Sequence, residues 1–190
     1  MGVLQSLLIT PSYYTSRDCA QNLGPILDSH QVHYAMYRCD DMSLAEDFAL
    51  QCKRRGIRVV LNATFDNANP LAILDSHLLR HFDGIHLKGA YFTCIDSIAR
   101  HYGGIIGFSA HSVDEVYEAL RSGAHYCTLS PIFPTPNKPA PLGIQSLHAL
   151  HIQAREKTFA LGGIVSDSHI AKITSIEHIK GFGSIRYFFS

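Results

Sequence analysis

Two glycine-containing segments near the end of this 190-residue chain have the composition of a phosphate-binding backbone. Gly162-Gly163 and Gly183-Ser184 each lie at the end of a short apolar run. Glycine allows the backbone to approach an anion closely, and backbone N–H groups in such loops can hold a phosphate. A lone Gly-Gly pair could simply form a turn. Two such segments in succession along the chain favour a phosphate site.

The segment Gly107-Phe-Ser-Ala-His-Ser112 supplies an imidazole that could transfer protons. Ser112 and Glu115 have the spacing of a capping box, so a helix should begin after Ser112. His111 would then lie just before that helix, above the end of the preceding strand. Histidine titrates near neutral pH, which suits a general acid or base. The alternative is that His111 is an ordinary surface residue among twelve histidines.

A proline-rich segment between these two motifs predicts a rigid loop. Residues 131–143 contain five of the eight prolines, together with Lys138. Proline fixes φ and stiffens the backbone. Rigid loops above strand ends commonly position ligands, so this segment is a candidate wall of a binding site.

The elements that must position these motifs can be read from eight short apolar runs that alternate with amphipathic stretches. The runs are continuously apolar, which is typical of parallel strands covered by helices. The predicted strands span residues 6–10, 33–38, 58–62, 84–88, 104–109, 126–130, 158–162 and 179–185. The predicted helices span residues 17–29, 43–55, 68–81, 92–102, 112–122, 143–155 and 166–174. This alternation predicts a parallel α/β fold.

Eight strand–helix units favour a compact (β/α)8 barrel, a TIM barrel, as one domain over residues 1–190. An open, doubly wound sheet is the alternative, because periodicity does not reveal closure. The chain is short for this barrel, which typically needs about 200 residues or more. It stops at residues 187–190, directly after the eighth strand, so the eighth covering helix is missing. We expect a symmetric partner, in a homodimer, to cover that edge.

The composition excludes several classes of partner. Hydrophobic residues make up 46% of the chain and charged residues 17%, and the 16 basic residues balance the 16 acidic ones. No basic stripe indicates nucleic acid, and no apolar run is long enough to span a membrane. The five cysteines lie far apart, without a C-x-x-C pair, and no signal peptide is visible. These features favour a reducing cytoplasm.

Three motifs together resemble the thiamine phosphate synthase and thiazole tautomerase family. They are Gly107-Phe-Ser-Ala-His-Ser112, Ser130-Pro-Ile-Phe-Pro-Thr135 followed by Lys138, and Leu161-Gly-Gly-Ile164. The resemblance implies a (β/α)8 barrel that acts in thiamine biosynthesis on a small phosphorylated thiazole or pyrimidine, usually as a dimer. Phosphate-binding barrels of other pathways share the glycine loops. The strand-six segment favours the thiamine family.

The resemblance implies one of two reactions. The synthase joins a pyrimidine diphosphate to a thiazole phosphate, with Mg2+ held by aspartates. The tautomerase shifts a proton on thiazole phosphate carboxylate and needs no metal. Where a synthase has aspartates, this chain has Ala63 and Tyr91. Mg2+ prefers hard oxygen ligands such as carboxylates, so we expect no cofactor; Mg2+ would be needed only if Asp40 or Asp66 served as relocated ligands.

The tautomerase interpretation gives each candidate residue a role. His111 would be the base or proton shuttle, and the glycine segments would hold the phosphate. The candidate substrate-binding residues are Arg38, Asn62, Lys88, Ser109 and Lys138. Lys88 could instead be a solvated surface residue, and Asn62 could cap a turn. His86 could simply pack within the barrel.

Two other functions remain open at this point. One is a divergent thiamine phosphate synthase with relocated metal ligands. The other is a non-catalytic barrel that binds a thiamine-pathway phosphate. The direction in which His111 points separates the catalytic interpretation from the non-catalytic one.

Overall fold

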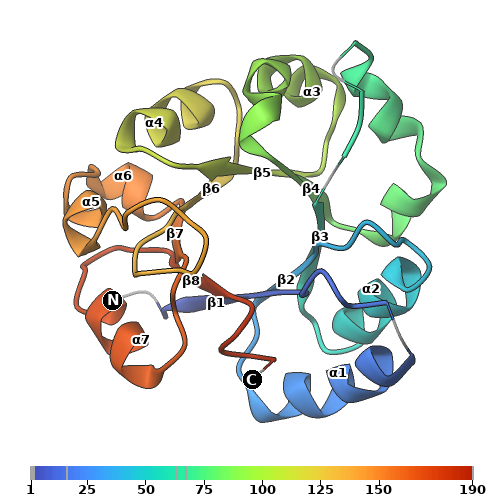
Figure 1. The fold of residues 1–190 in the computed structure, drawn as a ribbon. Coiled ribbons are helices and arrows are strands. Elements are labelled where there is room, and N and C mark those ends of the chain that lie inside the picture. The colour runs from blue at the N-terminus through green and yellow to red at the C-terminus, as the bar shows by residue number, and fades with distance from the viewer. Residues whose placement is uncertain (1–2, 16, 63, 67, 190) are drawn as a thin grey trace.

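Eight parallel strands close into a barrel, with each strand hydrogen-bonded to its neighbours in chain order (Figure 1). The computed structural model describes residues 3–15, 17–62, 64–66 and 68–189. The strands are β1 (Gln5–Ile9), β2 (Tyr34–Tyr37), β3 (Arg58–Asn62), β4 (Gly84–Leu87), β5 (Ile105–Ala110), β6 (Tyr126–Leu129), β7 (Thr158–Leu161) and β8 (Gly181–Ser184). All eight predicted strands form. The pairing of β1 with β8 confirms the TIM barrel and excludes the open sheet.

A ring of helices surrounds the strands (Figure 1). The α-helices are α1 (Arg17–Ser29), α2 (Ala45–Lys53), α3 (Ile95–His101), α4 (Val113–Arg121), α5 (Ile144–His148), α6 (Ile152–Arg155) and α7 (Asp167–Thr174). Three short 3-10 helices complete the ring: η1 (Pro70–Asp75), η2 (His77–His81) and η3 (Gly89–Cys94). Each predicted helical region is therefore helical, although three of them differ in detail.

Extended residues divide two of the predicted helices. The region 68–81 forms η1 and η2 because Ser76 between them has an extended backbone, with φ −64° and ψ 121°. The region 143–155 forms α5 and α6 because His151 is likewise extended. The third difference concerns the helix predicted to begin at residue 43. Helix α2 begins two residues later, and the Ser43 N–H donates to Asp41 Oδ1 at 2.9 Å.

Aromatic rings fill the interior of the barrel near the amino ends of the strands. Tyr34, Tyr126 and Phe159 have ring centroids 5.5–6.0 Å apart, and we call these three residues the barrel floor. Below them, the Arg58 guanidinium lies 5.5 Å and the Lys180 ammonium 5.2 Å from the centre of the Tyr34 ring. The floor closes this end of the barrel. The carboxyl ends of the strands, where barrels of this fold commonly bind ligands, are therefore the candidate entrance, and we call this end the mouth.

The last described residues pack at the edge of the barrel beside β8 and α1. No helix follows β8 in the described residues, and the final turn runs back beside α1 (Figure 1). Phe188 is buried and stacks on Phe182, with centroids 6.2 Å apart. The rings of Tyr187 and Phe188 also lie 5.6 and 5.4 Å from His30 at the end of α1. Tyr187 and Phe188 therefore cover part of this edge, and the expected homodimer stays a prediction.

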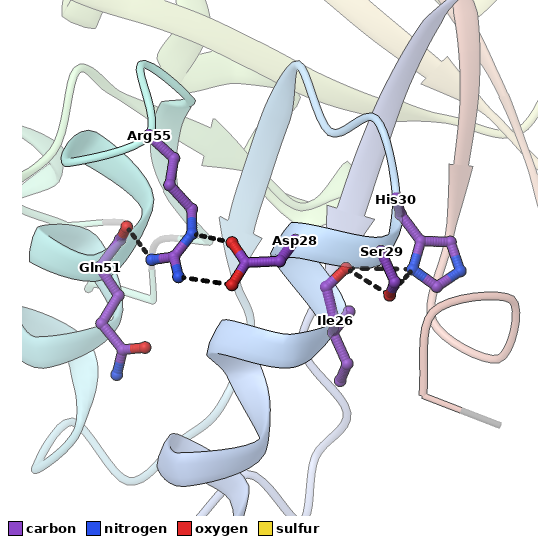
Figure 2. Close-up of polar contacts among 6 residues, drawn as sticks. All are labelled: Ile26, Asp28, Ser29, His30, Gln51 and Arg55. Carbon is purple, nitrogen blue, oxygen red and sulfur yellow. Dashed lines mark hydrogen bonds and ion pairs between the residues drawn. The ribbon is translucent and has the colours of Figure 1, made fainter.

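An ion pair between Arg55, which follows α2, and Asp28 in α1 links these two helices (Figure 2). Arg55 donates through Nε and Nη2 to the two carboxylate oxygens of Asp28, at 2.7 and 3.2 Å. Its Nη1 also donates to the Gln51 carbonyl oxygen at 3.2 Å. The hydrogen bonds from Arg55 lower the pKa of Asp28. This contact fixes the helix against which the C-terminal turn packs.

Two further features are the length of the helices and the burial of the cysteines. No helix in the described ranges is both long and apolar enough to cross a membrane. Four of the five cysteines are buried. These four are Cys39, Cys52, Cys94 and Cys127.

Candidate active site

Alternation along the strands places most of the candidate residues over the barrel interior. Successive side chains of a strand point to opposite faces, and Met36, Val60 and Tyr126 belong to the interior cluster. The register pairs Asn62 on β3 with His86 on β4, so both side chains point to the same, interior face of the sheet. Positions that keep this alternation face the interior or the mouth. They are Arg38, Asn62, His86, Lys88, Ser109, His111 and Ser130.

A fully buried imidazole connects the floor to the mouth. His86 Nδ1 lies 3.0 Å from the Tyr126 hydroxyl, and His86 Nε2 lies 2.8 Å from Ser109 Oγ. Burial, with a smaller contribution from the positive charge of Arg38, lowers the pKa of His86 to about 3. His86 is therefore neutral at physiological pH. Gly107 makes room for this pair, because a Cβ there would lie 2.5 Å from His86 Nδ1 and 2.4 Å from the Tyr126 hydroxyl.

The geometry of His111 leaves one ring nitrogen available as a base. Its Nδ1 lies 3.0 Å from the Ser130 carbonyl oxygen at the end of β6. The Ser130 hydroxyl lies farther from the same nitrogen, at 3.4 Å. A carbonyl oxygen only accepts hydrogen bonds, so the shorter contact favours a neutral ring in which Nδ1 carries the proton and Nε2 keeps its lone pair. The side chain is exposed rather than packed in the core. It lies close to the β4 loop, since a Cβ at Gly89 would be 3.9 Å from His111 Cδ2.

Glu115 fixes the backbone of His111. The predicted capping box is confirmed on one side, because the Glu115 N–H donates to Ser112 Oγ at 3.1 Å. On the other side the Glu115 carboxylate accepts from the N–H of His111 at 2.7 Å, one residue earlier than the motif specifies. Helix α4 therefore holds the residue that carries the candidate base. The sequence signal for this role was present in the capping-box spacing.

The glycines after β7 are required by backbone conformation and by close packing. Gly162 and Gly163 have φ values of +92° and +72°, in the left-handed region that side chains disfavour. A Cβ on Gly162 would lie 2.8 Å from Pro131 Cα, and one on Gly163 would lie 2.6 Å from the Phe133 carbonyl oxygen. The proline-rich loop thus packs directly on the glycine loop. The Phe133 N–H also donates to the Gly162 carbonyl at 3.0 Å.

This packing leaves backbone donors free in the glycine loop. Within the described ranges, the N–H groups of Gly163 and Ile164 donate no backbone hydrogen bond. Helix α7, which begins at Asp167, follows them and adds positive potential from its amino end. The loop therefore has the free donors that a phosphate site requires. The anion itself stays a prediction.

The segment at the end of β8 supports this loop by two different means. Gly183 faces the barrel interior, where a Cβ would lie 3.2 Å from Leu161 Cδ1 and 3.3 Å from Leu7 Cδ2. The Ser184 hydroxyl donates to the Ile164 carbonyl at 2.7 Å and accepts from the Tyr187 N–H at 3.1 Å. Ser184 thus ties the β8 loop to the glycine loop. Only its backbone remains available to a phosphate.

The cationic candidates occupy different parts of the mouth. Lys88 Nζ donates to Thr64 Oγ1 at 2.8 Å, which holds the ammonium between the β3 and β4 loops. Arg38 is exposed after β2, and Lys138 is exposed on the proline-rich loop. Asn62 is buried, and its amide nitrogen lies 3.7 Å from Met36 Sδ, so it lies deeper than the other candidates.

The side chains at the expected metal positions do not fit Mg2+. The Tyr91 ring stacks on Phe65 at 4.1 Å, and its hydroxyl accepts from the Phe65 N–H at 3.2 Å. Ala63 lies outside the described residues. Asp66 Oδ1 accepts a hydrogen bond from the Ala68 N–H at 2.9 Å, and Asp40 is exposed. No group of three or more potential metal ligands occurs in the described part of the chain.

Fold and site together define a class of protein. A closed (β/α)8 barrel with free backbone donors after β7 has the arrangement in which barrels of this fold commonly build a phosphate site. A family model described as "Thiamine monophosphate synthase" matches residues 7–178. The chain therefore belongs to the thiamine monophosphate synthase family, which confirms the family predicted from the motifs.

Individual relatives agree with this assignment. A "Putative thiamine-phosphate synthase 2" of Aquifex aeolicus is 32% identical over 125 residues, covering 64% of this chain and 61% of the relative. A "Thiamine-phosphate synthase" of Caldivirga maquilingensis is 35% identical over 98 residues, covering 50% and 47%. The chain thus spans only about half to three fifths of these relatives. A solved thiamine phosphate pyrophosphorylase from Pyrococcus furiosus shares the fold, with a TM-score of 0.70 at 18% identity over 96% of this chain and 85% of that one.

Proposed function

We propose that this protein is an enzyme of thiamine biosynthesis that shifts a proton on thiazole phosphate carboxylate without a metal. The observation that carries the proposal is the orientation of His111, whose Nδ1 is held by the Ser130 carbonyl at 3.0 Å. That contact leaves Nε2 as a base at the mouth. The family supplies the thiazole phosphate as the substrate class.

The reaction needs one base and a held substrate. His111 Nε2 would take a proton from a ring carbon, and the electron pair of that C–H bond would enter the ring as it becomes aromatic. The imidazolium would then return a proton to the exocyclic carbon, so the substrate keeps its atoms. General acid–base catalysis of this kind contributes a factor of roughly 10²–10⁴ to the rate.

The remaining candidates would hold the two charged ends of the substrate. The free N–H groups of Gly163 and Ile164 would bind the phosphate. Lys88 and Arg38 would balance the carboxylate and the charge that develops in the ring. Preorganised cations at the mouth can do this without a metal ion, which suits a site whose described carboxylates do not converge.

The thiamine-phosphate synthase reaction is the second candidate. The names of the curated relatives favour it over the proton shift. A diphosphate substrate carries several negative charges that metal ions usually help to neutralise. In this chain that task would fall to Arg38, Lys88 and Lys138, assisted by any metal ion that the substrate itself brings.

Two assays on the purified chain separate these functions. In the first, the exocyclic tautomer of thiazole phosphate carboxylate is followed by ultraviolet absorbance in EDTA. In the second, pyrimidine diphosphate and thiazole phosphate are supplied with Mg2+, and thiamine phosphate is measured. We expect turnover in the first assay only. Turnover in the second only would replace the proposal with the synthase reaction, and turnover in neither would favour a non-catalytic binder.

A further inference from the structure

Tyr126, His86 and Ser109 form a chain of two hydrogen bonds, which we call the column. The burial of Tyr126 and His86 determines which group is the donor in each bond. Tyr126 and His86 are fully enclosed, and burial raises the pKa of Tyr126 well above its usual value of 10.0. Tyr126 is therefore a neutral phenol that carries a hydroxyl proton. In the described residues, the one hydrogen-bond partner of that hydroxyl is His86 Nδ1, at 3.0 Å.

Each step of the column follows from the one below it. A buried donor without an acceptor is costly, so the Tyr126 hydroxyl donates to His86 Nδ1. His86 Nδ1 must then be unprotonated, and the neutral ring carries its proton on Nε2. That N–H donates to Ser109 Oγ at 2.8 Å. Ser109 Oγ thus accepts from below, and its own proton is left to point away from His86.

We propose that Tyr126 and His86 are positioning residues that turn the Ser109 hydroxyl proton toward the mouth, so that Ser109 donates to an acceptor group of the bound ligand. Ser109 is partly exposed, and His86 is its one side-chain partner in the described ranges. The reverse direction would leave the buried Tyr126 proton without an acceptor. Tyr126 of the barrel floor therefore determines that Ser109 acts as a hydrogen-bond donor to the ligand.

The strand order indicates which end of the ligand Ser109 meets. The free N–H groups follow β7, whereas Ser109 lies on β5, with β6 between them in the barrel. Lys88 follows β4 on the same side as Ser109. A hydroxyl donor beside an ammonium fits an anionic acceptor, such as a carboxylate. This assignment rests on the proposed function, in which the substrate carries a phosphate at one end and a carboxylate at the other.

The first test examines the unmodified protein and needs no ligand. Histidine labelled with 15N is incorporated, and the spectrum of His86→Gln identifies the ring signals of His86. We expect a neutral ring with the proton on Nε2, unchanged from pH 5 to pH 8. A proton on Nδ1, or a charged ring in that range, would overturn the proposal.

The second test compares two phosphorylated thiazoles, with and without the carboxylate, by equilibrium binding. Tyr126→Phe frees His86 to hold its proton on either nitrogen. We expect it to reduce the preference for the carboxylated ligand by about threefold to tenfold. This factor corresponds to the loss of the neutral Tyr126–His86 hydrogen bond, which sets the direction of the Ser109 hydroxyl. Tyr34→Phe is the matched control, because its hydroxyl bonds Arg58 at 2.7 Å in the same floor and has no bond to His86. The control should keep the wild-type preference.

The two tests separate failure of this inference from failure of the proposed function. An unchanged preference in Tyr126→Phe would overturn the positioning role, even if the wild type turns over thiazole phosphate carboxylate. If the wild type binds neither thiazole, the proposed function is wrong, and the tautomer of His86 alone then decides the inference. Thermal unfolding of both variants shows whether the floor remains intact.

Discussion

His111 Nδ1 lies 3.0 Å from the carbonyl oxygen of Ser130, so the end of β6 orients the imidazole that stands above β5. Ser130 also begins the proline-rich loop, which packs on the glycines after β7. One connected backbone therefore carries both the group that orients the candidate base and the wall of the candidate phosphate site. Movement of this loop would disturb both functions at once.

Replacing Gly163 by valine should abolish binding of a phosphorylated thiazole. The φ of +72° is unfavourable for valine, and its Cβ would lie 2.6 Å from the Phe133 carbonyl oxygen. The loop must shift, and its free N–H groups move with it. Isothermal titration measures the loss. Gly103→Val is the control, since nothing lies within 4 Å of a Cβ there. Normal affinity in Gly163→Val would place the phosphate site elsewhere.

Replacing Glu115 by alanine should reduce both stability and turnover. The change removes the acceptor of the His111 N–H at 2.7 Å and weakens the start of α4. We expect a loss of roughly 1 kcal/mol in the free energy of unfolding, typical of a helix cap, and a lower kcat. Urea unfolding and steady-state kinetics measure the two effects. Glu118→Ala, an exposed change on the same helix, should alter neither. Full activity in Glu115→Ala would mean that this bond does not position His111.

Stability should fall as the pH drops below 6.5, partly because of His86. Its pKa is about 3 in the folded protein, whereas the ordinary value for histidine is 6.5, so the unfolded chain binds one more proton between these limits. The free energy of unfolding then decreases by roughly 1.4 kcal/mol per pH unit. Urea unfolding between pH 6.5 and 4.5 measures the slope. Most carboxyl groups are still ionised in that range.

The variant His86→Gln isolates the contribution of this residue. It should make the free energy of unfolding less dependent on pH, by about the contribution of one proton. The exposed change His148→Gln on α5 should leave this dependence unaltered. His33, whose pKa burial also lowers, contributes to the slope in every variant. An equal slope in wild type and His86→Gln would show that His86 is protonated in the folded protein.

Replacing Phe188 by alanine should destabilise the barrel. The side chain is buried between Phe182 and His30, and truncation of a buried phenylalanine typically costs about 3–5 kcal/mol. Thermal unfolding measures the effect. Val3→Ala, at an exposed apolar residue, serves as the control. A negligible change in Phe188→Ala would show that the C-terminal turn does not cover the edge of the barrel.

The strands could be predicted because burial on both faces makes them continuously apolar. The position of His111 just before a helix could also be predicted, since Ser112 and Glu115 have the spacing of a helix start. The role of Ser184 could not. Its hydroxyl bonds Ile164, twenty residues away, and only the folded loops bring these residues together. Sequence motifs locate loops, but they do not determine which atoms form hydrogen bonds between one loop and another.

Tyr126 was missed because an aromatic residue in an apolar run is read as core. Its interior position depends on the register, which aligns Gly107 with Tyr126 on one side and with His86 on the other. A glycine within a strand signals a close approach, and here it makes room for the His86–Tyr126 pair. The glycine was visible in the sequence, but the identity of its neighbours was not.

The role of His111 is measured most directly by comparing wild type and His111→Ala in the aromatisation of thiazole phosphate carboxylate, in EDTA. We expect the wild type to turn over and the variant to lose a factor of roughly 10²–10⁴ in kcat, with nearly unchanged affinity for the phosphorylated ligand. Equal rates in both proteins, or a loss of binding in place of turnover, would contradict the role of His111 as the proton carrier.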